Sequence, residues 1–283
     1  MPDANFDCAS PRGRAGGARV KTMRLRVITV TRGESPYWAA AAASIATAAA
    51  GCDWIIVAPA NRLERVLAEA PHARGLSELA PGLYPNLNHA LAAPGDWDAF
   101  TWLNDDDILL PGFAAALRRF AEATDVDVLY GRVPLIDRSG QRVAAIPVAK
   151  RPADLAALWQ ARIVPLAQPG TLLRRTTIEC LGGFDLSYRL AGDADLFIRA
   201  LAAGARFEHL PKDVAAFRLV AGQLSKQAMA VEAETRRAVN ALPVVRSTTA
   251  AVWRFKTTNL PAYLERVRRH GWKSMRQIYD ATN

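Results

Sequence analysis

The chain has 283 residues, of which 51% are apolar and 22% are charged. This is ordinary usage for a globular protein, and it excludes a disordered chain or a coiled coil. A chain of this length can bury one large core, which favours a sizeable α/β domain over a small stapled module. The three cysteines, Cys8, Cys52 and Cys180, lack the paired spacing of a zinc site.

The net charge of +9 is concentrated at the two ends of the chain. Residues 1–24 hold 5 Lys/Arg against 2 Asp/Glu, and residues 226–283 hold 11 against 4, while the chain between them is nearly neutral. Residues 1–24 lack the apolar run of a signal peptide, and we interpret them as a disordered basic leader. The basic tail predicts attraction to a polyanion or to an anionic membrane surface, unless its charges merely solvate surface helices.

The predicted elements begin as strands and helices in alternation. Runs of β-branched and aromatic residues predict strands, and alanine-rich or amphipathic runs predict helices. Strands are expected at residues 25–31, 53–57, 99–103 and 126–130, and helices at residues 38–52, 62–69, 85–92 and 111–123. This alternation predicts a parallel, doubly wound sheet. The longest weakly apolar stretch, residues 38–52, is too short to span a membrane.

The second half of the chain has a different pattern. Residues 133–136 and 142–146 flank an Asp-Arg-Ser-Gly turn and predict a hairpin at the far side of the sheet. A helix at residues 152–161, an extended segment at 171–174 and a helix at 192–203 are expected next. Beyond residue 226 the chain is predicted to be mainly helical and basic.

Three consecutive carboxylates, Asp105, Asp106 and Asp107, directly follow the third predicted strand. Ligands of open α/β sheets bind at the carboxyl ends of the strands. Adjacent carboxylates repel one another unless a cation neutralises them, and Mg²⁺ or Mn²⁺ takes oxygen ligands from carboxylates and substrate phosphates. The sequence therefore predicts a divalent ion that holds a diphosphate. The alternative is a helix cap, with extra carboxylates that complement the dipole of the next helix.

A second acidic pair, Asp193 and Asp195, lies at the start of the predicted helix at residues 192–203. A carboxylate anchored there could act as a general base and take the proton of an attacking hydroxyl. Helix capping is the alternative for both residues.

Several segments, taken in order, resemble glycosyltransferase family 2. They are residues 25–31, Trp-Leu-Asn-Asp-Asp-Asp-Ile at 102–108, Gln-Pro-Gly-Thr-Leu-Leu-Arg-Arg at 168–175, Gly-Gly-Phe-Asp at 182–185 and Ala-Gly-Asp-Ala-Asp-Leu-Phe-Ile-Arg at 191–199. Gly-Leu-Tyr-Pro-Asn-Leu-Asn at 82–88 is similar to the family's Gly-Ile-Tyr-Asp-x-x-Asn segment, and residues 217–226 resemble its closing loop. The resemblance covers residues 25–226, and the ordered combination is more specific than any one motif.

The resemblance implies a GT-A fold over residues 25–226, a Rossmann-like and mostly parallel sheet flanked by helices, with a basic helical extension at 227–283. It implies an inverting glycosyltransferase of bacterial polysaccharide or glycan biosynthesis, with Mg²⁺ or Mn²⁺, a nucleoside-diphosphate sugar and a glycan or lipid-linked acceptor. The odd number of widely spaced cysteines and the lack of a signal peptide predict a cytoplasmic protein, and the basic tail predicts peripheral contact with the inner face of an anionic membrane.

The resemblance implies roles for single residues as well. Asp193 would be the base, Asp106 or Asp107 would bind the metal, and Asn104 and Asp105 would face the ribose and diphosphate. The other matching positions are Thr31, Arg32, Tyr84 and Asn88, which would line the nucleotide, and Gln168, which would lie near the sugar or acceptor.

The chain departs from the family pattern at two positions. Ala58, after the second strand, stands where the family has a carboxylate that faces the nucleotide base, and Ala80 replaces a second Asp. These losses leave open a weak or inactive relative that only binds nucleotide or glycan. A nucleotidyltransferase should have a glycine- and lysine-rich phosphate loop, which residues 31–36 lack. A nucleic-acid binder should have basic and aromatic residues across the whole domain, so no nucleic acid is expected as a partner.

Overall fold

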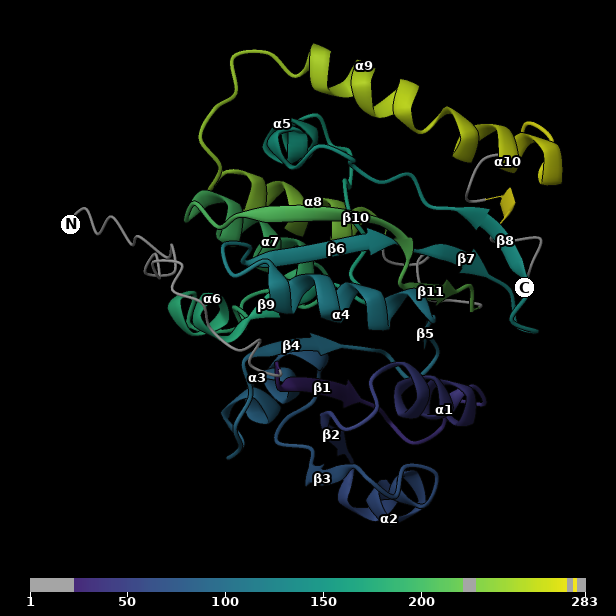
Figure 1. Ribbon diagram of the computed structural model, residues 1–283, viewed down its shortest axis with the longest axis vertical. Coiled ribbons are helices and arrows are strands. Elements are labelled where there is room, and N and C mark those ends of the chain that lie inside the picture. The colour runs from purple at the N-terminus through teal and green to yellow at the C-terminus, as the bar shows by residue number, and fades with distance from the viewer. Residues whose placement is uncertain (1–22, 221–227, 274–276, 279–283) are drawn as a thin grey trace.

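The computed structural model describes residues 23–220, 228–273 and 277–278. Its centre is a seven-stranded sheet in the order β10-β6-β9-β4-β1-β2-β3 (Figure 1). These strands are β1 (Leu25–Val30), β2 (Asp53–Ala58), β3 (Arg74–Ser77), β4 (Ala99–Trp102), β6 (Val128–Arg132), β9 (Leu172–Arg174) and β10 (Phe207–Asp213). The predicted leader lies almost entirely outside the described residues, and so does the predicted boundary at residue 226.

The sheet is mostly parallel, as predicted. Strands β4, β1, β2 and β3 run parallel to one another, and β10 runs parallel to β6. Strand β9 is the exception, because it lies between β4 and β6 and is antiparallel to both. The chain that leaves the carboxyl end of β6 therefore enters β9 at the same edge of the sheet, and it needs no crossover to the opposite edge.

A second sheet of four strands has the order β5-β11-β7-β8. Its strands are β5 (Ile108–Leu109), β7 (Pro134–Ile136), β8 (Arg142–Ala145) and β11 (Ala215–Arg218). The predicted hairpin is confirmed as the antiparallel pair β7–β8, but it belongs to this second sheet and not to the main one. Strand β11 pairs with β5 directly after the acidic segment, so the second sheet supports that segment.

Helices cover both faces of the main sheet (Figure 1). They are α1 (Trp38–Ala48), α2 (Ala60–Ala68), α3 (Leu83–Ala92), α4 (Gly112–Glu122), α5 (Leu155–Gln160), preceded by the 3-10 turn η1 (Pro152–Asp154), α6 (Arg175–Cys180), α7 (Gly192–Ala202), α8 (Ala228–Val239), α9 (Thr249–Thr258) and α10 (Leu260–His270). Among the described residues, no helix combines the length and apolar character needed to cross a membrane.

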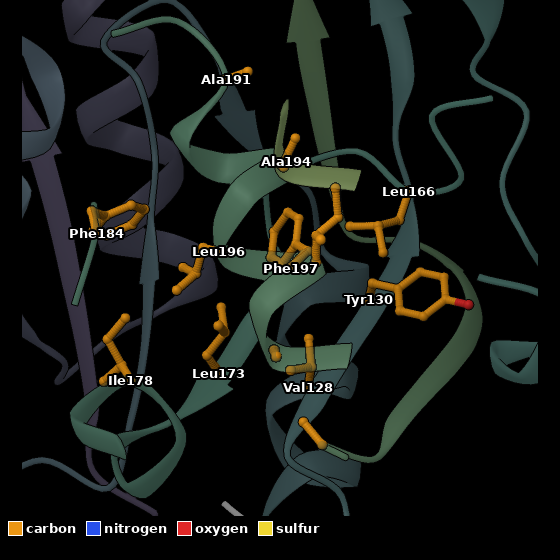
Figure 2. Packing of buried hydrophobic residues seen from close by; sticks show 14 of the residues in the cluster. Val128, Tyr130, Leu166, Leu173, Ile178, Phe184, Ala191, Ala194, Leu196 and Phe197 are labelled. Atoms are coloured by element: carbon orange, nitrogen blue, oxygen red, sulfur yellow. The ribbon is translucent and has the colours of Figure 1, made fainter. Parts of the chain in front are cut away.

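The two faces of the sheet form two separate cores. Neighbouring residues of a strand point to opposite faces, so Val27 joins the core with α1 and α4, while Ile28 joins the core with α3 and α7. Figure 2 shows the second core, where Phe197 and Leu196 of α7 pack beside Leu173 of β9. Because the central strands are buried on both faces, they are continuous apolar runs, which is why the sequence predicts them well.

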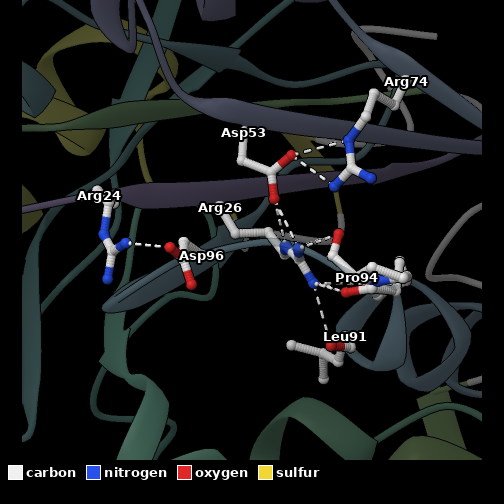
Figure 3. A network of polar contacts seen from close by, with 9 residues as sticks. Arg24, Arg26, Asp53, Arg74, Leu91, Pro94 and Asp96 are labelled. Atoms are coloured by element: carbon white, nitrogen blue, oxygen red, sulfur yellow. Dashed lines mark hydrogen bonds and ion pairs between the residues drawn. The ribbon is translucent and has the colours of Figure 1, made fainter.

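Arg26 is a fully buried cation near the start of β1. It bonds to Asp53 of β2 at 2.8 Å, and it donates to carbonyls at the end of α3, including those of Ala90 at 3.1 Å and Ala93 at 2.8 Å (Figure 3). Loss of solvent lowers the pKa of Arg26, although Asp53 acts in the opposite direction. The contacts satisfy carbonyls that a helix end leaves without partners, and so fix α3 on the sheet.

Candidate active site

The loops that follow β1 and β4 are joined by hydrogen bonds at the carboxyl edge of the sheet. The Thr31 hydroxyl donates to the Asp105 carboxylate and accepts the Gly33 amide at 2.9 Å. The Ser35 hydroxyl donates to the Asp105 carbonyl at 3.0 Å. Arg32, next to Thr31, is exposed and acts on Asp105 through its charge. The predicted residues Thr31, Arg32 and Asp105 therefore lie together.

Asp107 is a fully buried carboxylate with two protein partners. It accepts the Arg218 amide at 2.9 Å and lies 3.5 Å from the Asn104 side-chain nitrogen. Loss of solvent, and then the charge of Asp106, raise the pKa of Asp107 well above its ordinary value. Through its bond to the Arg218 amide, Asp107 thus anchors the acidic segment on the second sheet. Burial and the charge of Asp106 make ionisation of Asp107 costly.

Arg218, at the end of β11, connects the acidic segment to the second sheet. Its guanidinium donates to the Asp106 carbonyl at 2.8 Å and to the Asp137 carbonyl at 2.9 Å, and it lies 4.5 Å from the Tyr37 ring centroid. Arg218 is only 3% exposed. The sequence placed it in the segment that resembles a closing loop, but no local pattern indicated this contact across the molecule.

The acidic segment suits a hard divalent cation. Loss of solvent raises the pKa of Asp105 as well as that of Asp107, so a nearby positive charge would relieve both. Of the two predicted ligands, Asp106 keeps 7% exposure and Asp107 has none. In the described part of the chain, no three His, Cys, Asp or Glu side chains could hold an ion together. Mg²⁺ and Mn²⁺ fit such a site, because substrate phosphates and water complete their shells.

Asp193 lies at the start of α7, half-buried, in a segment held by Tyr84. The Tyr84 hydroxyl accepts the Gly192 amide at 2.8 Å. A Cβ atom on Gly192 would lie 2.7 Å from the Tyr84 ring, so only glycine fits there. Loss of solvent raises the pKa of Asp193, which makes it a stronger base once it is ionised.

Asp195 has a structural partner. Arg199, one turn later in α7, donates to its carboxylate at 2.7 Å, and Asp195 is 3% exposed. The same guanidinium donates to the carbonyls of Leu181 at 2.9 Å and Gly183 at 3.0 Å. The pair therefore ties α7 to the preceding glycine turn, and this use of Asp195 favours Asp193 as the reacting carboxylate.

Glu234 of α8 supports the segment before Asp193, and no local sequence pattern indicates this contact. Its carboxylate accepts the backbone amides of Arg189 at 3.1 Å, Leu190 at 2.9 Å and Ala191 at 2.8 Å. Burial alone would raise the pKa of Glu234, but these amides and Arg237 lower it. With the bond from Gly192 to Tyr84, four successive amides before Asp193 have side-chain acceptors.

Aromatic packing brings the start of α7 to the end of β4. Trp102, just before the acidic segment, lies 6.2 Å from Phe197 of α7 and 5.1 Å from Phe184 between ring centroids. Figure 2 shows Phe184 and Phe197 in the same core. Gln168 donates to the Trp102 carbonyl at 2.7 Å, so this predicted residue also lies next to the acidic segment.

Asn88 and Tyr84 lie on the α7 side of the site. Asn88 accepts the Phe184 amide at 2.9 Å and donates to the Phe184 carbonyl at 2.8 Å. The side chains of both predicted residues thus form hydrogen bonds with the backbone of the segment that leads to Asp193.

No model of a known family matches the chain, and no curated protein matches its sequence. Its fold does match solved structures. TarS from S. aureus, in complex with UDP-GlcNAc, is 14% identical, with a TM-score of 0.56 over 87% of this chain and 69% of that one. The mannosyltransferase PcManGT from Pyrobaculum calidifontis, in complex with GDP-Man and Mn²⁺, is 14% identical, with a TM-score of 0.53 over 93% and 86%.

A third match is glucosyl-3-phosphoglycerate synthase from Mycobacterium tuberculosis, in complex with Mn²⁺, UDP and phosphoglyceric acid. It is 17% identical, with a TM-score of 0.55 over 78% of this chain and 80% of that one. At such identities the likeness is one of fold. The chain therefore has the GT-A fold of these glycosyltransferases, as its sequence predicts.

Proposed function

We propose that the chain is an inverting glycosyltransferase that moves a sugar from a nucleoside-diphosphate donor to an acceptor hydroxyl. The observation that carries the proposal is the acidic segment at the carboxyl ends of parallel strands, with Thr31 bonded to Asp105 and the start of α7 on the same core. Ligands of open α/β sheets bind at this edge. Structures with the same fold that contain UDP-GlcNAc, GDP-Man or UDP support the choice of donor.

The donor side of the site is assigned to residues of the β1 and β4 loops. Asn104 and Asp105 face the ribose and diphosphate beside Thr31 and Arg32. Asp106 would hold Mg²⁺ or Mn²⁺, and the buried Asp107 next to it keeps the segment in place. The bound ion would neutralise the charge that develops on the departing diphosphate.

The acceptor side is assigned to Asp193 and Gln168. Asp193 takes the proton of the acceptor hydroxyl while that oxygen attacks the anomeric carbon from the face opposite the diphosphate. One displacement inverts the configuration, through a transition state with oxocarbenium character. Gln168 faces the sugar or the acceptor. Tyr84 and Asn88 hold the backbone of the segment before Asp193 and line the nucleotide from that side. The acceptor is a glycan or a lipid-linked glycan of bacterial polysaccharide synthesis.

Thermal unfolding with a panel of nucleoside diphosphates, each with Mn²⁺ or with a chelator, tests the proposal. Ligands that bind only the native state raise the melting temperature. We expect one nucleotide to stabilise the protein with Mn²⁺ and to lose this effect in the chelator and in Asp106→Asn. No stabilisation by any nucleotide would contradict the proposal. Stabilisation without donor hydrolysis or transfer would instead identify an inactive relative that only binds nucleotide.

A further inference from the structure

Helices α9 and α10 lie end to end along one edge of the molecule (Figure 1). Asn259 alone separates them, and its backbone angles of φ −100° and ψ 10° lie outside the α-helical range, so the helix is interrupted at this residue. The inner face of α9 is docked on the body, because Phe255 is 6% exposed and Asn259 exchanges two hydrogen bonds with the Val148 backbone, at 3.0 and 2.9 Å. The inner face of α9 thus packs on the α/β domain and leaves its opposite face free of that contact.

The opposite face carries large apolar side chains that contact no core. Trp253 is 67% exposed, Leu260 is 53% and Leu264 is 58%. Leu260 and Leu264, four residues apart, lie on one side of α10, and Trp253 is exposed on α9. Trp272, two residues after the end of α10, is 93% exposed. We call these four residues the outer apolar stripe. An exposed apolar surface of this kind marks an interaction site.

Positive charges flank the outer apolar stripe. Lys256 and Arg268 are exposed; Lys256 lies three residues after Trp253 on α9 and Arg268 lies four residues after Leu264 on α10, so each cation neighbours an apolar residue on the surface of its own helix. Residues 249–273 hold six Lys/Arg side chains and a single carboxylate, Glu265. Arg142 of β8 engages that carboxylate at 2.8 Å. Arg254 pairs with Asp154 of η1, but Lys256, Arg268, Arg269 and Lys273 are exposed, so the surface of this segment is cationic beside its apolar residues.

We propose that the outer apolar stripe docks onto an anionic lipid surface, with the indoles and leucines in the headgroup boundary and the cations on lipid headgroups. Apolar side chains with flanking cations are the chemistry of an interfacial helix. A nucleic acid would satisfy Lys256 and Arg268 but leave Trp272 and the leucines in water. A second copy placed face to face would oppose like charges. The surface goes beyond the proposed reaction, and its test needs neither donor nor acceptor.

Sedimentation with vesicles tests the proposal on the full chain. Vesicles of phosphatidylcholine mixed with phosphatidylglycerol should bind the protein, pure phosphatidylcholine vesicles much less, and high salt should weaken the binding. Leu264→Ser combined with Trp272→Ser should lower the partition coefficient at least tenfold, since two apolar side chains contribute more than this even when they are only partly buried. Val244→Ser is the matched control, because Val244 is 92% exposed in the same tail but lies outside the stripe.

A second pair of variants tests the charges. Lys256→Gln and Arg268→Gln should each weaken binding to the anionic vesicles roughly fivefold. Arg118→Gln on α4, an exposed arginine far from the stripe in sequence, should leave it unchanged. Equal binding to neutral and anionic vesicles, or wild-type binding by the Leu264 and Trp272 variant, would overturn the proposal. The proposal would also be overturned if the protein formed a dimer that did not bind vesicles and that this variant disrupted. A second copy of the chain would then cover the stripe.

Discussion

Arg199 donates to the Asp195 carboxylate at 2.7 Å, two residues after Asp193 at the start of α7. In the described part of the chain Asp193 has no such ion pair, so the two carboxylates that look alike in sequence have different surroundings. We therefore predict that Asp193→Asn lowers turnover roughly 100-fold or more while donor affinity barely changes, because a general base is lost. Asp195→Asn still offers an oxygen to Arg199 and should keep most of the activity. A crippled Asp195→Asn beside a normal Asp193→Asn would reverse the assignment.

The pH dependence of turnover should report on the same carboxylate. Burial raises the pKa of Asp193 above the ordinary value of 3.8, and only the ionised form can accept a proton. Turnover should therefore fall on acidification at a pH above 3.8. A group with a raised folded-state pKa contributes stability that is lost as the pH rises through that pKa. Asp193→Asn should consequently melt no lower than wild type at neutral pH, and a lower melting temperature would contradict its burial as a charged group.

The neighbouring carboxylates Asp106 and Asp107 should behave differently when they are replaced. Asp106→Asn should remove the effect of Mn²⁺ on nucleotide affinity and leave the melting temperature of the free protein nearly unchanged. Asp107→Ala removes the acceptor of the buried Arg218 amide, and should lower the free energy of unfolding by about 1–3 kcal/mol. Calorimetric titration with and without Mn²⁺, and urea unfolding, measure the two effects. Equal behaviour of both variants in both assays would contradict this division of roles.

The sequence predicts well what is encoded by neighbouring residues. Strands β1, β2 and β4 are continuous apolar runs, and the acidic segment follows one of them directly. The sequence pattern does not predict β3, because its four residues are half or fully exposed. It also does not predict β10, because the sequence Phe-Glu-His-Leu-Pro-Lys-Asp carries charges and a proline. Strands β5 and β11, with two and four residues, are also missed, because they are defined by their pairing.

The supports of the candidate site were missed for a related reason. Arg218 reaches Asp107 across 111 residues of chain, and Glu234 reaches Ala191 across 43. No local pattern shows such contacts, although the segments that they join were recognised. The sequence therefore indicates candidate reacting side chains, and only the fold shows what holds them.

Tyr84 offers a test of whether the predicted nucleotide side also controls the base. Its hydroxyl accepts the Gly192 amide, next to Asp193, so Tyr84→Phe removes that acceptor and keeps the ring in place. We expect turnover to fall roughly tenfold, since small displacements of a catalytic group have large effects on rate. The affinity for the nucleotide, measured separately, should change little. A loss of affinity with unchanged turnover would show that the hydroxyl acts on the nucleotide instead.

Glu234 extends this argument to α8. Its carboxylate accepts hydrogen bonds from three successive backbone amides before Asp193. Glu234→Gln keeps one acceptor oxygen, loses the other and removes the charge, and should lower the free energy of unfolding by about 1–2 kcal/mol. Its lowered pKa means that the stability it contributes is present at neutral pH and is lost as the pH falls through that pKa. The difference from wild type should therefore shrink in acid. Glu232→Gln is the matched control, since Glu232 lies on the same helix, is exposed and makes only surface ion pairs in the described residues, with Arg236 at 2.8 Å and Arg162 at 3.8 Å. That variant should stay within about 0.5 kcal/mol of wild type.

Because the amides held by Glu234 lead directly to the proposed base, Glu234→Gln should also reduce turnover more than donor affinity. Equal effects of the two substitutions on stability and turnover would show that these bonds do not position Asp193.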